Sequence, residues 1–243
     1  MAVSMRVRLA ATMAAELHQR EGRNLVAVGV FGSVGRGQER EYSDIDLLVV
    51  TRRKRPWIDD VYRDGFLVTV LQLTPDEAKD EVTGSRRDIN AALGGWTSMR
   101  PLFDPSGLLT RLKRRAKEPS TKQFRAAAQS AFLEVYEDLG KLWNAIEADD
   151  EEEAREMAIW FTTAASGALF DLDRLVLPTG RRSFIEIRRY GTVGNAIRRL
   201  RYENLGLPET LRLSEAIWVS LLRRASREGI ALPDFPRKSR TSL

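Results

Sequence analysis

The spacing of hydrophobic residues divides the chain near residue 118 into an alternating part and a helical part. In the first part, short apolar runs of strand length alternate with amphipathic stretches of helical period. The predicted strands are residues 25–31, 45–50, 66–73 and a stretch that begins at 99. The predicted helices are residues 7–21, one that begins after the cap Thr74 with Pro75 in its first position, and residues 108–117. This order predicts a sheet with helices packed against it.

The pattern becomes almost wholly helical after Glu118-Pro119-Ser120. Apolar residues recur there every three or four positions, which is the period of an amphipathic helix. The predicted helices are residues 123–148, 151–177, 193–201 and 209–227. We therefore expect an α+β protein with two domains, residues 1–118 and 119–243.

Composition narrows the chemistry that the 243-residue chain can support. It has no cysteine and a single histidine, His18, so disulfides, thiolate metal sites and histidine clusters for zinc are excluded. A divalent metal would need oxygen ligands, which favours Mg²⁺ or Mn²⁺. The formal net charge of +5 permits anion binding. Few aromatic residues interleave the basic runs at 52–55, 111–115 and 198–199, so we expect solvated surfaces there rather than nucleic-acid contacts. No apolar run is long enough to span a membrane, and no signal-peptide pattern is present, so the cytoplasm is expected.

One motif carries most of the chemistry. Gly32-Ser33 ends an apolar run, and Asp44-Ile45-Asp46 begins the next strand eleven residues after the serine. A glycine-serine turn can hold phosphate through backbone N–H groups and a hydroxyl. Asp44 and Asp46 point to one face of the strand, where two like charges need a cation beside them. Together they indicate metal-assisted nucleotide chemistry.

This combination resembles the signature of the nucleotidyltransferase superfamily, which includes DNA polymerase beta. The stretches Gly-Ser-Val-Gly-Arg at 32–36 and Tyr-Ser-Asp-Ile at 42–45 are most similar to aminoglycoside nucleotidyltransferases of the kanamycin type. So is Tyr-Glu-Asp-Leu-Gly-Lys-Leu-Trp-Asn at 136–144. The resemblance implies a nucleotidyltransferase fold with a small mixed sheet, followed by a helical bundle for substrate binding and dimerisation.

The resemblance also implies roles in the first domain. Ser33 and Arg36, in the turn that begins with Gly32, would contact the triphosphate of ATP. Asp44 and Asp46 would be catalytic metal ligands for Mg²⁺ or Mn²⁺. The implied reaction transfers AMP from ATP to a hydroxyl of a small molecule, possible acceptors including an aminoglycoside, and releases pyrophosphate.

Two further roles fall in the helical domain. Glu137 would be the general base, and Lys141 would contact the nucleotide phosphates. Residues four apart share a helix face, so the pair suits a common surface, although an ordinary ion pair has the same spacing. In the resembling family the site is shared between two subunits, which implies a homodimer.

One position departs from the superfamily pattern. The third acid is expected in an apolar-acid-apolar triplet, and here the triplet is Val68-Thr69-Val70. Asp64, before the strand, and Asp88 are acids that could take its place. The neutral Thr69 leaves open a slow enzyme, a changed metal requirement, or a nucleotide-binding module without catalysis. A protein- or RNA-modifying nucleotidyltransferase is a separate alternative to the small-molecule enzyme.

Overall fold

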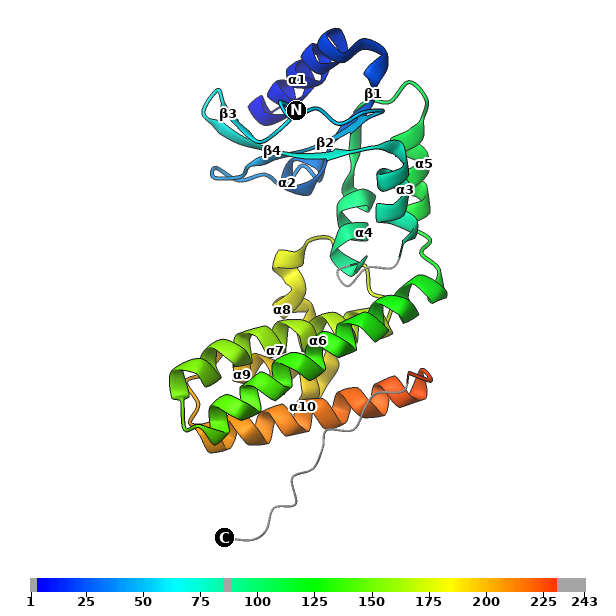
Figure 1. Ribbon diagram of the computed structural model, residues 1–243. Coiled ribbons are helices and arrows are strands. Elements are labelled where there is room, and N and C mark those ends of the chain that lie inside the picture. The colour runs from blue at the N-terminus through cyan, green and yellow to red at the C-terminus, as the bar shows by residue number, and fades with distance from the viewer. Residues whose placement is uncertain (1–3, 85–88, 231–243) are drawn as a thin grey trace, which may run out of the picture. The chain divides into compact units, whose positions relative to one another are not determined.

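The computed structural model describes residues 4–84 and 89–230, which form two compact units (Figure 1). The first unit contains the chain up to Gln123 together with Val176–Arg182, and the second contains Phe124–Leu175 and the residues from Ser183 onward. The substitute acid Asp88 lies outside the described residues. No described helix is both long enough and apolar enough to cross a membrane.

A five-stranded mixed sheet forms the centre of the first unit. Its elements are α1 (Met5–Glu21), the 3₁₀ turn Gly22–Asn24, β1 (Leu25–Val30), α2 (Gly32–Gly35), β2 (Ile45–Thr51), β3 (Val61–Arg63), β4 (Phe66–Leu73), α3 (Pro75–Thr83), α4 (Ile89–Ser98), β5 (Arg100–Phe103) and α5 (Leu108–Ala116). The strand order is β3-β4-β2-β1-β5, with β2 and β4 parallel and the other neighbours antiparallel. The predicted mixed sheet with flanking helices is confirmed.

The alternation of β2 sends its side chains into two different layers. Ile45, Leu47 and Val49 join the buried cluster formed with the apolar face of α1, and Figure 1 shows α1 lying along that face of the strands. The other face is covered at β1 by Met99 and Leu109, which lie against Gly29. Because side chains alternate along a strand, Asp46 faces away from α1. The core therefore directs this carboxylate out of the α1 layer.

The start of α3 follows from local chemistry. Thr74 accepts a hydrogen bond from the backbone N–H of Glu77, and the Glu77 side chain accepts from the backbone N–H of Thr74. This reciprocal pair is a capping box, with Pro75 in the first turn. The helix start predicted at Thr74 is confirmed.

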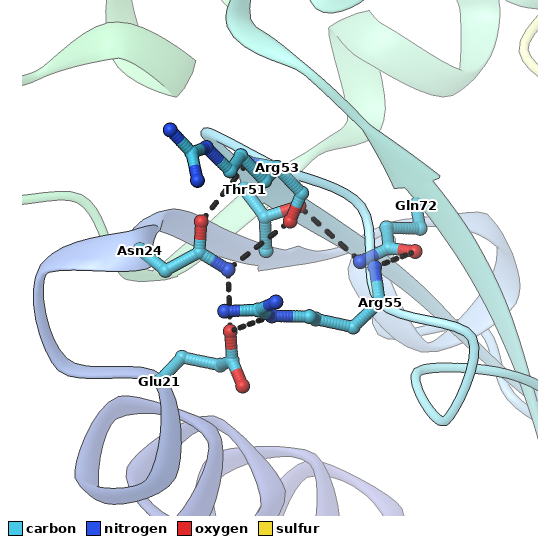
Figure 2. A network of polar contacts seen from close by, with 6 residues as sticks. All are labelled: Glu21, Asn24, Thr51, Arg53, Arg55 and Gln72. Atoms are coloured by element: carbon cyan, nitrogen blue, oxygen red, sulfur yellow. Dashed lines mark hydrogen bonds and ion pairs between the residues drawn. The ribbon is translucent and has the colours of Figure 1, made fainter.

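A polar network closes the end of β2 that lies away from Asp46 (Figure 2). The Asn24 side chain accepts from the backbone N–H of Arg53 at 2.9 Å and donates to the backbone carbonyl of Arg53 at 3.1 Å. Glu21 accepts from both Asn24 and Arg55. The Gln72 amide bonds the backbone N–H of Arg55 and the hydroxyl of Thr51. The network ties the basic loop after β2 to the sheet.

The second unit is all helical. Its elements are α6 (Thr121–Glu147, whose first residues belong to the first unit), α7 (Glu151–Leu172), α8 (Ser183–Glu186), the 3₁₀ turn Ile187–Tyr190, α9 (Gly191–Tyr202) and α10 (Leu207–Arg227). Phe132, Leu139 and Phe161 are fully buried between the helices. Trp143 donates from Nε1 to the hydroxyl of Ser214 at 3.0 Å, which joins α6 to α10. The predicted helical bundle is confirmed.

Helix α7 ends five residues before the predicted limit of 177, so that prediction is wrong. Arg174 adopts a left-handed conformation with φ 53°. The N–H groups of Arg174 and Leu175 then bond the carbonyls of Asp171 and Phe170, at 3.1 and 2.8 Å. These bonds form a Schellman-type end in which arginine takes the place usually held by glycine. The early end releases Val176–Arg182, hereafter the crossing segment, to pack with the first unit.

Candidate active site

The turn after β1 is fitted to Asp46. Gly32 has φ +62°, and a Cβ built on it would lie 1.8 Å from Oδ2 of Asp46. The backbone N–H of Phe31 also donates to the carbonyl of Asp46 at 3.0 Å. Only glycine allows this conformation together with so close an approach. The turn and the carboxylate therefore form one rigid arrangement.

Ser33 has an unused hydroxyl in this arrangement. Its Oγ is buried and has no hydrogen-bond partner among the residues that the structure describes. A buried hydroxyl without a partner is costly, and a ligand, an ion or an ordered water molecule can complete its bonding. The observation fits the predicted phosphate contact.

Asp46 lies opposite Thr69 in the parallel register of β2 and β4. The Thr69 hydroxyl donates to Oδ1 of Asp46 at 3.2 Å. Burial raises the pKa of Asp46, and the negative charge of Asp44 raises it further. The hydrogen bond from Thr69 and the positive charges of Arg181 and Arg36 act in the opposite direction. This carboxylate is thus held where ionisation is unfavourable until positive charge is supplied.

The residues present suit a divalent ion held by few protein ligands. Mg²⁺ usually binds one or two carboxylates and completes its shell with water and substrate phosphate. Asp44 and Asp46 would provide the two carboxylates, and burial together with the negative charge of Asp44 raises the pKa of Asp46. The donor set is all oxygen, as such an ion prefers.

Within the described part of the chain, no third acid joins this pair. Among residues 4–84 and 89–230, no group of three acidic or histidine side chains is placed to hold a metal. Asp64, which could replace the third acid, sits in the β3–β4 turn with φ 51°, and its Oδ2 lies 3.9 Å from Nε of Arg63. Continuing the β3–β4 register places Asp60 across from Thr69, but its carboxylate accepts the backbone N–H of Val70 at 2.7 Å. Two carboxylates and a threonine hydroxyl are therefore the candidate ligands among the residues that the structure describes.

The crossing segment adds residues that the sequence reasoning missed. Nη1 of Arg36 donates to the backbone carbonyl of Pro178 at 2.9 Å. Arg181 lies three residues further along, in the 3₁₀ turn Gly180–Arg182. Its positive charge lowers the pKa of Asp46. The run Gly-Arg-Arg was visible in the sequence, but nothing local indicated that it packs beside residues 32–46.

Glu137 and Lys141 lie one turn apart on α6 in the second unit. Nζ of Lys141 is 2.7 Å from Oε1 of Glu137, and both side chains are more than half exposed. The bond to Glu137 raises the pKa of Lys141. Burial raises the pKa of the adjacent Asp138, whose side chain faces the core side of the helix. The two residues present an acid–base pair on the exposed face of α6.

The basic runs bond largely within the protein. Arg52 donates to the carbonyl of Arg23, Lys54 is 2.8 Å from Glu77, and Arg55 contacts Glu21. In the second unit Arg199 pairs with Glu203 and Glu209, at 2.9 and 3.1 Å. Residues of these runs therefore form polar contacts within their own units.

A family model for the nucleotidyltransferase domain matches residues 12–166. The chain belongs to the nucleotidyltransferase family. The matched region includes the Gly32-Ser33 turn, both aspartates of the Asp-x-Asp motif, and Glu137 with Lys141. The family expected from these motifs is confirmed.

Two curated nucleotidyltransferases resemble part of the chain. They are aminoglycoside nucleotidyltransferases (4') from a Bacillus species and from Staphylococcus aureus, each 26% identical over 125 residues. The alignments cover 51% of this chain and 49% of each relative. The chain therefore spans about half the length of the curated relatives that it matches.

A solved structure shows the same fold. It is a nucleotidyltransferase-like protein from Exiguobacterium sibiricum 255-15, with a TM-score of 0.61 and 13% sequence identity. The match covers 92% of this chain and 77% of the other. At this identity the likeness concerns architecture, and it agrees with a nucleotidyltransferase fold followed by helices.

Proposed function

We propose that this nucleotidyltransferase moves AMP from ATP to a hydroxyl of a small molecule and releases pyrophosphate. The observation that carries the proposal is the fit between Gly32 and Asp46, with the buried, unbonded hydroxyl of Ser33 beside it. A phosphate-sized acceptor of hydrogen bonds would satisfy Ser33, and a cation would relieve the two carboxylates. Family membership supplies the reaction class.

In this proposal Ser33 and Arg36 hold the triphosphate, and Asp44 and Asp46 hold Mg²⁺ or Mn²⁺. When bound, the ion would neutralise negative charge on the phosphates as the leaving group departs. Thr69 donates to Asp46 and so keeps one carboxylate oxygen oriented. Gly32 keeps the backbone close enough for these groups to act on one phosphate chain.

The second unit contributes the proton acceptor. Glu137 takes the proton from the acceptor hydroxyl, and the resulting oxygen attacks the α-phosphorus. The bond from that phosphorus to the bridging oxygen breaks, and pyrophosphate carries away the electron pair. Lys141, bonded to Glu137, offers its positive charge to the phosphates. In the homodimer implied by the family resemblance, the partner subunit would donate this pair.

An aminoglycoside is the first acceptor to test, because both curated relatives carry that name. Helical residues 119–243 would then bind acceptor and partner subunit, and residues 1–118 would hold the nucleotide. We place the reaction in the cytoplasm. The lack of a third carboxylate among the described residues favours one alternative, a nucleotide-binding module that transfers nothing.

Transfer of radiolabelled AMP to a panel of aminoglycosides, proteins and RNA tests the proposal. Label on an aminoglycoside, with stoichiometric pyrophosphate, would support it. Label on protein or RNA alone would transfer the assignment to a macromolecular acceptor. ATP binding without transfer to any acceptor would instead favour the non-catalytic module. Light scattering at several protein concentrations tests the homodimer separately.

A further inference from the structure

We infer that Arg181, on the crossing segment, is a second arginine for the phosphates of the nucleotide beside Arg36. The inference rests on the proposed function and adds a residue that comes from a distant part of the chain. Three observations support it. The crossing segment is bonded to the rest of the first unit, Arg36 donates a hydrogen bond to it, and the positive charge of Arg181 lowers the pKa of Asp46.

The crossing segment is anchored at its start by backbone packing. The N–H of Leu177 donates to the carbonyl of Asn90 at 2.9 Å, and the Leu177 side chain is 1% exposed. Gly94 makes this approach possible, because a Cβ there would lie 1.5 Å from the carbonyl oxygen of Leu177. The segment therefore lies directly against α4, in a position that no bulkier residue at 94 would allow.

The next residues are fixed from the phosphate turn itself. Arg36 reaches from the end of α2 to the Pro178 carbonyl with a 2.9 Å bond. The N–H of Arg182 then donates to the carbonyl of Thr179 at 3.1 Å, which closes a tight turn around Arg181. Two anchors, at Leu177 and at Pro178, thus fix the backbone that leads to Arg181.

Arg181 is well placed in charge as well as in position. Its side chain is exposed, and its positive charge acts on Asp46, as does that of Arg36. One guanidinium N–H of Arg36 is already used by Pro178. A polyphosphate chain beside Asp46 needs further donors, and the planar fork of arginine suits phosphate oxygens. Arg181 supplies that second fork.

Equilibrium binding by isothermal titration calorimetry tests the inference on the full-length protein. The ligands are Mg-ATP and inorganic tripolyphosphate, and the variants are Arg181→Gln and Arg181→Lys. Losing a charge-assisted hydrogen bond should weaken both ligands by about 10-fold to 100-fold in Arg181→Gln. Arg181→Lys should recover part of the loss, because it keeps the charge without the fork.

Arg52→Gln provides the matched control. Arg52 is also exposed, but it follows the opposite end of β2 from Asp46, where it donates to the backbone carbonyl of Arg23. The affinity of Arg52→Gln for both ligands should stay within about 2-fold of that of the wild type. If Arg181→Gln binds ATP as well as Arg52→Gln does, the inference is wrong while the proposed function stands. If the wild-type protein binds neither ligand, both are wrong.

Discussion

Replacing Gly32 by alanine separates backbone strain from loss of the site. Gly32 and Gly37 both have positive φ, +62° and +65°, so alanine is strained at either position. Their surroundings differ completely. A Cβ at Gly32 would meet Asp46, whereas a Cβ at Gly37 has no atom within 4 Å. Gly37→Ala is therefore a control that carries the same strain without the collision.

The expected magnitudes follow from these contacts. Each variant should lose about 1–2 kcal/mol of unfolding free energy from the left-handed conformation. In Gly32→Ala the Cβ lies 1.8 Å from Oδ2 of Asp46, against 3.4 Å for ordinary contact, so the two must separate by about 1.6 Å. Misplacing a reacting group by about 1 Å can cost on the order of 100-fold in rate. We expect at least that loss of AMP transfer in Gly32→Ala alone.

Calorimetric unfolding and Mg-ATP titration measure the two effects separately. Both variants should unfold at lower temperature than wild type, and Gly37→Ala should bind Mg-ATP normally. Gly32→Ala should lose most of its nucleotide affinity while remaining folded at assay temperature. Equal nucleotide binding and transfer in the two variants would show that Asp46 has no role at the phosphate turn.

Four further changes test other parts of the structure. Asp46→Asn should abolish transfer, and in EDTA its stability advantage over wild type should grow as pH rises. Burial raises the pKa of Asp46 in the folded state, so the protonated carboxyl stabilises the wild-type protein in full below pH 3.8, the ordinary pKa of an aspartate. This stability is lost as the pH rises through the higher folded pKa. A stability difference between Asp46→Asn and wild type that stays constant with pH in urea titrations would contradict this. Thr69→Glu should tighten Mn²⁺ binding measured by titration, and Thr69→Val, which removes the bond to Asp46, should not. Glu137→Gln should stop turnover while ATP still binds, whereas Glu151→Gln, in the exposed pair with Arg155, should leave both unchanged; normal turnover in Glu137→Gln would remove it from the mechanism. Asn24→Ala should cost about 1–3 kcal/mol of unfolding free energy through the network at the far end of β2, with Mg-ATP affinity unaltered.

Local patterns predict the elements that local chemistry decides. The apolar run of β4 is bounded by Gly65 and Thr74, and the capping box fixes the start of α3 within a few residues. The end of α7 is different. The left-handed residue that ends this helix is Arg174 rather than a glycine, so the usual sequence signal for a helix end is missing. Hydrophobic residues continue to 177, and their spacing therefore predicts a helix that is too long.

The site divides in the same way. Gly32, Ser33 and Asp46 lie within fifteen residues of one another, and their order along strand, turn and strand is enough to predict proximity. Arg181 is far from them in sequence. The crossing segment that carries it is held by hydrogen bonds to Asn90 and Arg36. These hydrogen bonds are tertiary contacts, and the spacing of hydrophobic residues along the sequence does not predict them.

The crossing segment also affects the order in which the protein folds during synthesis. A ribosome releases the chain from its N-terminus, so all five strands have emerged before Val176 is made. Until then the carbonyl of Asn90 lacks the N–H of Leu177, and the surface at Gly94 stays uncovered. The first unit therefore reaches its final form only after α7 has been synthesised. A nascent chain that stalled within α7 would carry the sheet and both aspartates but no Arg181.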